Sequence, residues 1–248
     1  MSLIERQERA YQIPYEIESL QNLVASKNPK VIVEIGSSFG GTLPRWLFLD
    51  GAQTIISIDL PDGSFGGVSR EEKDELRKEC EEYSASHGKV FYQILSDSHQ
   101  PITVDKLNAI LQTGKIDFLF IDGDHSYEGV LRDFQMYAGL VKEGGLIGFH
   151  DILNSKFHRK SGSYVQALWH RLKRFFFYSE FITDDKEEYK RIMPWSYPTG
   201  FGGIGVIKYD SSIFQRFISQ TSIQGKPRDI VLTLSALFRR NSRYRTVL

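Results

Sequence analysis

The chain has a single cysteine, Cys80, no net charge and no long apolar run. One cysteine permits neither an intramolecular disulfide nor a cysteine-based zinc site, which favours a reducing compartment. The 31 basic and 31 acidic side chains balance, and this argues against sequence-independent nucleic-acid binding. No segment is apolar enough to cross a membrane or to act as a signal peptide. We therefore expect a soluble, cytoplasmic protein that neither binds nucleic acid nor spans a membrane.

Strand patterns alternate with helix patterns along the 248 residues. This alternation predicts one α/β domain, a Rossmann-like, doubly wound, mostly parallel sheet with helices on both faces. The core is expected over about residues 14–210, with an aromatic-rich added segment at 154–203 and a helical tail at 211–248. Apolar runs predict strands at Val31–Ile35, Thr54–Asp59, Val90–Leu95, Phe118–Ile121, Leu146–Phe149 and Gly205–Tyr209. Helical periodicity predicts helices at Pro14–Ser26, Gly41–Leu49, Arg70–Ser86, Val104–Leu111, Glu128–Leu140 and Ser163–Phe176.

The first predicted strand runs into a glycine-containing turn, and an acid precedes that turn. Glu34 lies two residues before Gly36, and Gly40 and Gly41 would let the next helix pack closely. A carboxylate here would repel a pyrophosphate and favour a positively charged group such as the ammonium of an amino-acid moiety. The glycine spacing also departs from the dinucleotide pattern G-x-G-x-x-G.

Two further predicted strands end in acids, at positions where a parallel sheet binds its ligands. Asp59 could accept hydrogen bonds from both hydroxyls of a ribose, or it could serve only in the turn that Pro61 begins. Asp97 could accept a hydrogen bond from an adenine amino group, with Ser98 beside the ring edge. Alternatively, Asp97 or Ser98 only caps the following helix.

The densest polar cluster follows the fourth and fifth predicted strands. Asp122 and His125 follow the fourth, and His150 and Asp151 follow the fifth. Asp122, His150 and Asp151 could ligate Mg²⁺ or another divalent metal, which would acidify a substrate hydroxyl. Alternatively, His150 or His125 acts as a general base without a metal, with Asp122 beside it.

The other four histidines have no comparable surroundings, and we expect them at the surface. They are His87, His99, His158 and His170. The tail holds an amphipathic pattern at Ile230–Phe238, which could be a solvated helix or a contact in a homo-oligomer.

Taken in order, the acids Glu34, Asp59, Asp97 and Asp122 resemble the motif series of class I S-adenosylmethionine-dependent methyltransferases. The resemblance extends from about Val31 to Tyr209, and residues 201–208 look like the last, antiparallel strand of a seven-stranded sheet. It implies the following cofactor-binding residues: Glu34, Gly36, Ser37, Ser38 and Gly40 for the methionine part, Asp59 and Leu60 for the ribose, Asp97 and Ser98 for the adenine, and Asp122 at the same edge.

The sequences around His125 and His150 look like one branch of this family, the sugar and small-molecule O-methyltransferases. Catechol-type methyltransferases are similar too, but they carry an Asp-Asn pair where this chain has His150 and Asp151. By analogy, residues 154–203 would wall the acceptor pocket. The sequence thus predicts methyl transfer to a hydroxyl of a sugar or other small molecule. A nicotinamide-dependent oxidoreductase and a non-catalytic binding protein are the alternatives.

Overall fold

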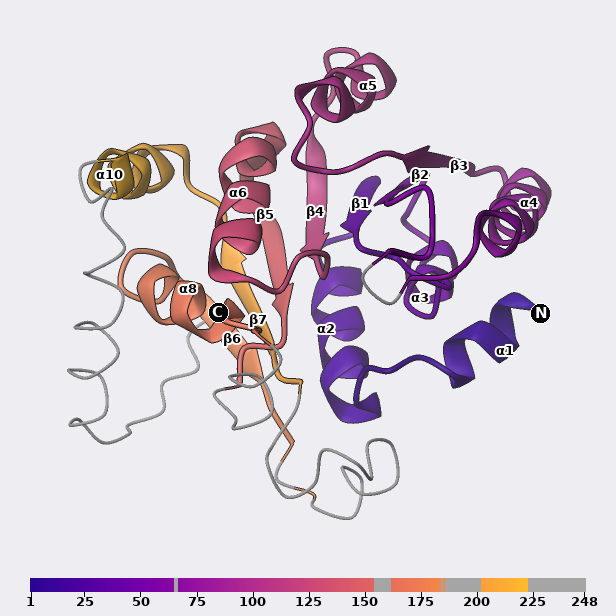
Figure 1. Ribbon diagram of the computed structural model, residues 1–248, viewed down its shortest axis with the longest axis horizontal. Helices are drawn as coiled ribbons and strands as arrows, with labels where there is room; N and C mark the ends of the chain where they lie inside the picture. Colours follow the sequence, from indigo (N-terminus) through magenta and orange to yellow (C-terminus); the bar gives the residue numbers. More distant parts are fainter. Residues whose placement is uncertain (65–66, 154–161, 184, 186–201, 223–248) are drawn as a thin grey trace.

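The computed structural model describes residues 1–64, 67–153, 162–183, 185 and 202–222, and these form one seven-stranded sheet (Figure 1). The strands lie in the order β3-β2-β1-β4-β5-β7-β6. The first five are parallel, and β7 is antiparallel to both of its neighbours. Their bounds are Val31–Ile35 (β1), Thr54–Asp59 (β2), Val90–Leu95 (β3), Ile116–Ile121 (β4), Val141–His150 (β5), Tyr178–Phe181 (β6) and Ile204–Lys208 (β7). This is the Rossmann-like, mostly parallel sheet that the alternating patterns predicted.

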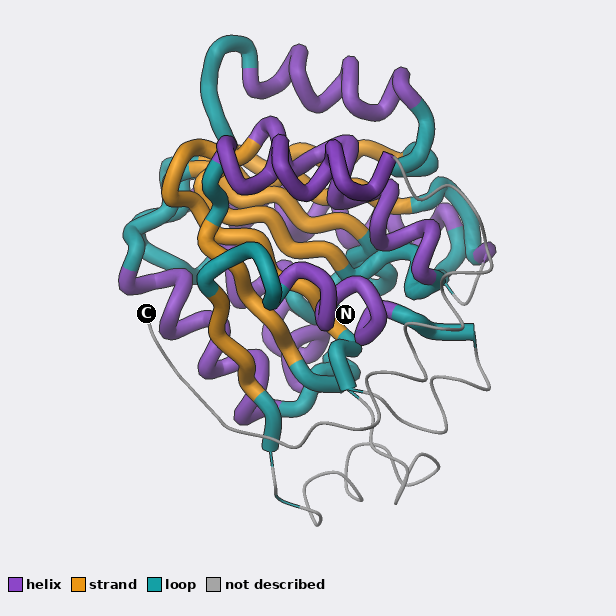
Figure 2. The backbone as a smooth tube through the Cα atoms, turned by 90° about the vertical axis from the view of Figure 1, so that its left-hand side faces the viewer, coloured by secondary structure: helices purple, strands orange, loops and turns teal. Residues whose placement is uncertain are grey.

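The strand register brings the carboxyl ends of the central strands to a common edge. Ile35 of β1 pairs with Ile58 of β2 and with Ile121 of β4, and Ile121 pairs with Phe149 of β5. Residues that directly follow these positions therefore meet at one edge, where doubly wound sheets bind ligands. Figure 2 shows the strands side by side as one twisted sheet.

Helices cover both faces because the strand side chains alternate between two apolar cores. Ile32 and Ile55 face a core shared with α2, α3 and α4, whereas Val33 and Ile56 face a core shared with α5, α6, α8 and α10. The helices are α1 (Leu3–Glu8), α2 (Pro14–Ser26), α3 (Leu43–Leu47), α4 (Arg70–Ser86), α5 (Pro101–Leu111), α6 (Tyr127–Tyr137), α8 (Val165–Leu172) and α10 (Ser211–Ser222), with a 3₁₀ turn, η2, at Ala138–Leu140. None of these helices has the length and apolarity that a membrane crossing needs.

The added segment expected at 154–203 contributes more to the core than its composition suggested. Strand β6 at Tyr178–Phe181 lies within it and forms one edge of the sheet. Trp169 and Phe176 are buried in the core that α6 also contacts, and they do not line the cavity described below. The expected tail pattern Ile230–Phe238 and the predicted surface residue His158 lie outside the described residues.

Gly36 is required by the turn between β1 and α3. Its φ is +88°, and a Cβ built there would lie 2.2 Å from the backbone oxygen of Asp122. Gly36→Ala should therefore destabilise the fold by about 2 kcal/mol or more, because two backbone segments would have to separate. Urea unfolding would measure this change.

Gly88 offers a matched control for that substitution. Its φ is +65°, but a Cβ there would meet no atom within 4 Å. Gly88→Ala should cost only about 1 kcal/mol of backbone strain. Equal losses of stability in the two variants would show that the close approach of Asp122 to Gly36 does not determine the effect of Gly36→Ala.

Candidate active site

A cavity of about 720 Å³ opens at the carboxyl ends of the parallel strands. Its wall is made by the residues that directly follow β1, β2, β3 and β4, together with Asp151 after β5 and two residues before α8. The polar members of this wall are Ser38, Asp59, Ser64, Ser96, Asp97, Ser98, His99, Asp122, Asp124, His125, Ser126, Asp151 and Ser163. The strand register thus brings together most of the acids that the sequence had singled out.

The glycine loop forms one end of the cavity, but Glu34 lies beneath the loop and not in the cavity wall. Gly36 and Ser38 line the cavity, whereas Glu34 is fully buried and accepts hydrogen bonds from Thr42 Oγ1 and Trp46 Nε1. Ser37 is also buried, with its hydroxyl 2.6 Å from that of Ser57. Gly40 and Ser37, like Glu34, are absent from the wall. Glu34 therefore ties the loop to α3, and Gly36 and Ser38 are the loop residues that can contact a ligand directly.

Burial raises the pKa of Glu34 to about 7, although the hydrogen bonds from Thr42 and Trp46 oppose the shift. An unfolded glutamate titrates near 4.5, so between pH 4.5 and 7 the folded state holds a proton that the unfolded state has lost. Stability should therefore fall across this window by about 3 kcal/mol on account of Glu34.

Glu34→Gln should remove that pH dependence. A glutamine amide can still accept from Trp46 and can donate to the Thr42 hydroxyl, so the variant keeps the local hydrogen bonds. Relative to the parent protein, it should gain about 3 kcal/mol of stability between pH 4.5 and 7.5, measured by urea unfolding at each pH. The exposed Glu18 supplies the control, since Glu18→Gln should show no such change. A pH-independent difference for Glu34→Gln would contradict the assignment.

Asp59 at the end of β2 is held by a buried lysine that the sequence analysis did not identify. Its carboxylate is paired with Lys73 Nζ, and its Oδ1 accepts from the backbone N of Leu60 at 2.9 Å. The Lys73 side chain is 1% exposed. The signal was present in the sequence, because Lys73 shares one helical face with the apolar Leu76 and Cys80. Asp59 and Leu60 both line the cavity.

The third-strand residues Asp97 and Ser98 line the cavity, and His99 lines it beside them. Asp97 Oδ1 accepts from the backbone N of His99 at 2.8 Å. Burial alone would raise the pKa of Asp97, but hydrogen bonds from His99 and Gln100 outweigh it and lower the pKa. The carboxylate is 44% exposed, so it retains capacity to accept from a ligand.

His99 was expected at the surface, and this expectation is wrong. Its side chain is only 17% exposed, and its Nε2 lies 3.3 Å from Oδ1 of the fully buried Asp133 of α6. The hydrogen bond to Asp133 raises the pKa of His99. The sequence gave no local sign of this pair, because Asp133 lies on a helix 34 positions away from His99 in the chain. Of the other histidines expected at the surface, His87 is exposed and His170 is half-buried.

Asp122, His125, His150 and Asp151 form one compact cluster. Asp122 Oδ1 lies 3.1 Å from His125 Nε2 and 3.1 Å from His150 Nδ1. On the other side, Asp151 Oδ2 lies 3.1 Å from His125 Nδ1, and Asp151 Oδ1 lies 3.3 Å from His150 Nδ1. Asp151 reaches this position through a left-handed backbone, with φ of +62°, which Asp adopts more readily than most residues.

The cluster fixes the protonation of its histidines. Both ring nitrogens of His125 face carboxylate oxygens, and a carboxylate can only accept, so both nitrogens carry a proton. Burial alone would lower the pKa of His125, but its hydrogen bonds to Asp122 and Asp151 outweigh burial and raise the pKa well above its usual value. For His150, the nearby charges of Asp122 and Asp151 likewise outweigh burial and raise the pKa to about 9.

The two histidines differ in their access to the cavity. His125 lines it, and its side chain is 37% exposed. His150 is not part of the wall, and its side chain is 4% exposed. A group in the cavity can therefore reach His125, whereas His150 acts only through the carboxylates that it contacts.

The expected metal ligands Asp122, His150 and Asp151 are paired with one another in this arrangement. His150 Nδ1 is directed at both carboxylates, so an ion bound there would have to displace the proton of His150 and replace these contacts. Within the described ranges, no group of three or more His, Cys, Asp or Glu side chains has the arrangement of a metal site.

The sequence is similar to known proteins over its central part. Residues 33–152, which run from within β1 to just beyond β5, match a family described as a methyltransferase domain. An uncharacterized protein, R132, of Acanthamoeba polyphaga mimivirus is 31% identical over 145 residues. That match covers 58% of this chain, and the chain spans only 61% of the length of R132.

Solved structures of methyltransferases share the fold. The O-methyltransferase TomG from Streptomyces achromogenes, solved with S-adenosylmethionine, is 13% identical, with a TM-score of 0.51 over 77% of this chain and 78% of TomG. A protein from Klebsiella pneumoniae described as a candidate O-methyltransferase is 14% identical, with a TM-score of 0.52 over 84% of this chain and 88% of that one. At these identities the likeness establishes the fold alone. The family match and the shared fold agree in indicating a methyltransferase domain over residues 33–152.

Proposed function

We propose that this chain transfers the methyl group of S-adenosylmethionine to an oxygen of a small acceptor, with a hydroxyl on a sugar or a similar metabolite as our preferred target. The observation that carries the proposal is the cavity, whose wall combines the glycine loop, the strand-end acids Asp59 and Asp97, and His125. The name of the structural neighbour TomG, an O-methyltransferase, supports oxygen as the acceptor atom.

The residues of the wall fit the parts of this cofactor in order. Gly36 and Ser38 line the end of the cavity that the glycine loop forms, so they would hold the amino-acid end. Asp59 would accept from the ribose hydroxyls, with Leu60 beside it. Asp97 would accept from the adenine amino group, with Ser98 at the ring edge. Asp122 follows β4, next to the loop, where it would lie close to the sulfonium end.

When bound, S-adenosylmethionine supplies a methyl group that its own sulfonium already activates. The tasks left to the protein are to align the acceptor hydroxyl for in-line attack and to take its proton. We assign the proton to His125, the histidine that the cavity exposes. Because His125 carries two protons in the folded state, it must lose one to solvent before it can act as a base. Asp122, Asp151 and His150 would hold its ring in place.

The proposal can be tested by incubating the protein with S-adenosylmethionine and a panel of acceptors, and by measuring S-adenosylhomocysteine. The panel should contain neutral sugars, phenols and catechols, each matched with an amine of similar shape. Product with hydroxyl acceptors would support the proposal, and preference among them would identify the class. Product only with amines would contradict oxygen as the acceptor atom, and binding without any turnover would favour the non-catalytic alternative.

Metal removal should leave turnover unchanged. His150 forms a hydrogen bond with Asp122 and an ion pair with Asp151, and the proposed mechanism uses no ion. We expect equal rates in EDTA and in excess Mg²⁺, because a step that needs no Lewis acid gains nothing from the ion. A loss of activity in EDTA that Mg²⁺ restores would instead establish the metal-dependent mechanism.

A further inference from the structure

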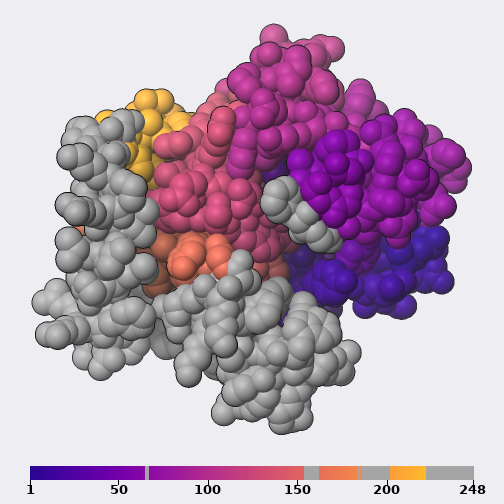
Figure 3. All heavy atoms as spheres, in the orientation of Figure 1, coloured from indigo at the N-terminus to yellow at the C-terminus, as the bar shows by residue number. Residues whose placement is uncertain are grey.

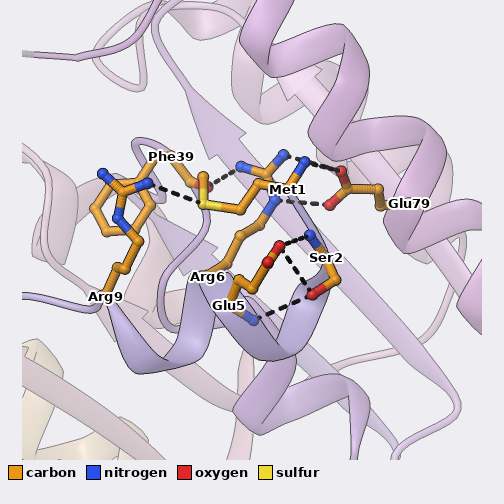
Figure 4. Close-up of polar contacts among 7 residues, drawn as sticks. All are labelled: Met1, Ser2, Glu5, Arg6, Arg9, Phe39 and Glu79. Carbon is orange, nitrogen blue, oxygen red and sulfur yellow. Dashed lines mark hydrogen bonds and ion pairs between the residues drawn. The ribbon is translucent and has the colours of Figure 1, made fainter.

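The glycine loop is supported from outside by the N-terminal segment. Arg6 of α1 is 2% exposed although it is an arginine. Its Nη1 donates to the backbone oxygen of Phe39 at 2.7 Å, and Phe39 lies within the loop (Figure 4). Its Nε and Nη2 donate to the two carboxylate oxygens of Glu79 of α4, at 2.7 and 3.2 Å. The ion pair thus orients the guanidinium so that its third nitrogen, Nη1, points at the loop.

Apolar contacts bring the same segment against the loop. A Cβ on Gly41 would lie 2.9 Å from Cα of Ala10, so the two backbones are in close approach. The rings of Tyr11 and Phe39 meet edge to face, with centroids 5.3 Å apart. In Figure 3 the start of the chain, in indigo, lies directly against the purple segment that contains α4.

The segment then reaches the acid of the active-site cluster. Gln12 Nε2 donates to Asp122 Oδ2 at 2.9 Å, while Asp122 Oδ1 faces the two histidines. Gln12 itself is not part of the cavity wall. One stretch of ten residues, from Leu3 to Gln12, therefore contacts both the loop proposed to hold the cofactor and the acid beside the proposed base.

We propose that residues 3–12 act as a clamp in which Arg6 positions the glycine loop for the amino-acid end of the cofactor and Gln12 positions Asp122 for turnover. This inference rests on the proposed function, since it uses the cofactor orientation given above.

The loop needs such support. Ser38 is not a glycine but has a positive φ of 47°, and backbone of this kind persists only where its surroundings hold it. An arginine used only for packing would leave its N–H groups to solvent. Here Arg6 is buried and three of its donors are directed at named acceptors, one of them in the loop.

The test for Arg6 compares S-adenosylhomocysteine with adenosine by calorimetric titration. Adenosine lacks the amino-acid end, so it would contact the β2 and β3 side of the cavity but not the loop. Arg6→Met should weaken S-adenosylhomocysteine about tenfold and leave adenosine within about twofold, because it removes one charge-assisted hydrogen bond to the loop. A purely structural defect would weaken both ligands equally, and that result would overturn the proposal.

Arg9 provides the matched control, because it carries the same charge at the end of the same helix but is exposed. Arg9→Met should bind both ligands like the parent protein. If Arg6→Met fails to fold, Glu79→Gln keeps the bond from Arg6 to Phe39 and removes the negative charge that pairs with Arg6 and with the N-terminal ammonium. It should weaken S-adenosylhomocysteine by about threefold, again without affecting adenosine. Unchanged affinity in the folded variants of Arg6 and Glu79 would contradict the clamp.

Gln12→Met tests the other contact of the clamp. It should lower kcat about tenfold and leave the affinity for S-adenosylhomocysteine unchanged, the reverse of the Arg6 pattern. Equal kcat for Gln12→Met and the parent would remove Gln12 from the proposal. If the parent protein itself binds no S-adenosylhomocysteine, the proposed function fails, and this outcome is distinct from parent-like binding by the Arg6 variant.

Discussion

Replacing His125 by Gln should reduce kcat by about 10²- to 10⁴-fold while S-adenosylhomocysteine still binds within a few-fold of the parent affinity. His125 is the histidine that lines the cavity, and its ring is held between Asp122 and Asp151. Gln preserves one donor toward these carboxylates but cannot take a proton. The rate should be measured as S-adenosylhomocysteine formed from the best acceptor of the panel.

Two other histidines serve as comparisons for this variant. His87→Gln, at an exposed position, should be fully active. His150→Gln should be impaired less than His125→Gln, because His150 is buried and contacts only the carboxylates. An active His125→Gln with an inactive His150→Gln would reverse the two assignments.

The pH profile offers an independent check of the same assignment. Since the pKa of His125 is raised well above 6.5, most of the protein at neutral pH holds the base in its protonated form. Turnover should therefore increase as the pH rises above neutrality. Asp151→Asn should move this rise in turnover to lower pH, because it removes one of the charges that raise the pKa of His125. Asn also tolerates the left-handed backbone at this position. If turnover in Asp151→Asn rises at the same pH as in the parent protein, a group other than His125 controls the pH dependence.

The second large effect is expected at Asp59. Asp59→Asn should weaken S-adenosylhomocysteine by about 30- to 100-fold, since hydrogen bonds to a charged acceptor contribute about 1.5–3 kcal/mol. Asn is preferable to Ala here, because it can still accept from the buried Lys73, whereas an unpaired ammonium would cost several kcal/mol of stability. Calorimetric titration would measure the affinity.

The exposed acid Asp62 is the matched control for Asp59. It lies three residues further along the same loop but does not line the cavity. Asp62→Asn should bind S-adenosylhomocysteine normally. If both variants bind like the parent protein, Asp59 does not hold the ribose.

The sequence was sufficient to predict the sheet, because a strand that is buried on both faces consists of a continuous run of apolar residues. Strands β1, β2 and β3 lie at the predicted residues, and β4 ends at the predicted Ile121. The strand-end positions of Asp59, Asp97 and Asp122 follow from β2, β3 and β4. The edge strand β6 was missed, because its four residues, Tyr178–Phe181, include Ser179 and Glu180 and carry only a short apolar pattern.

The partners of the site residues could not be predicted, because they come from distant parts of the chain. Lys73 reaches Asp59 from α4, Asp133 reaches His99 from α6, and Gln12 reaches Asp122 from the N-terminal segment. Periodicity places a residue on a face of its own element, but it does not determine which distant side chain it will meet. For the same reason, the sequence left Glu34 as a candidate ligand contact, although Thr42 and Trp46 already occupy its carboxylate.

The most direct test of the account is a calorimetric titration of the full chain with S-adenosylhomocysteine, alongside NADH. We predict micromolar binding of S-adenosylhomocysteine at one site per chain, weakened about 30- to 100-fold in Asp59→Asn and retained in His125→Gln, with no binding of NADH. Binding of NADH in place of S-adenosylhomocysteine, or binding of neither, would contradict the proposal that this cavity holds the methyl donor.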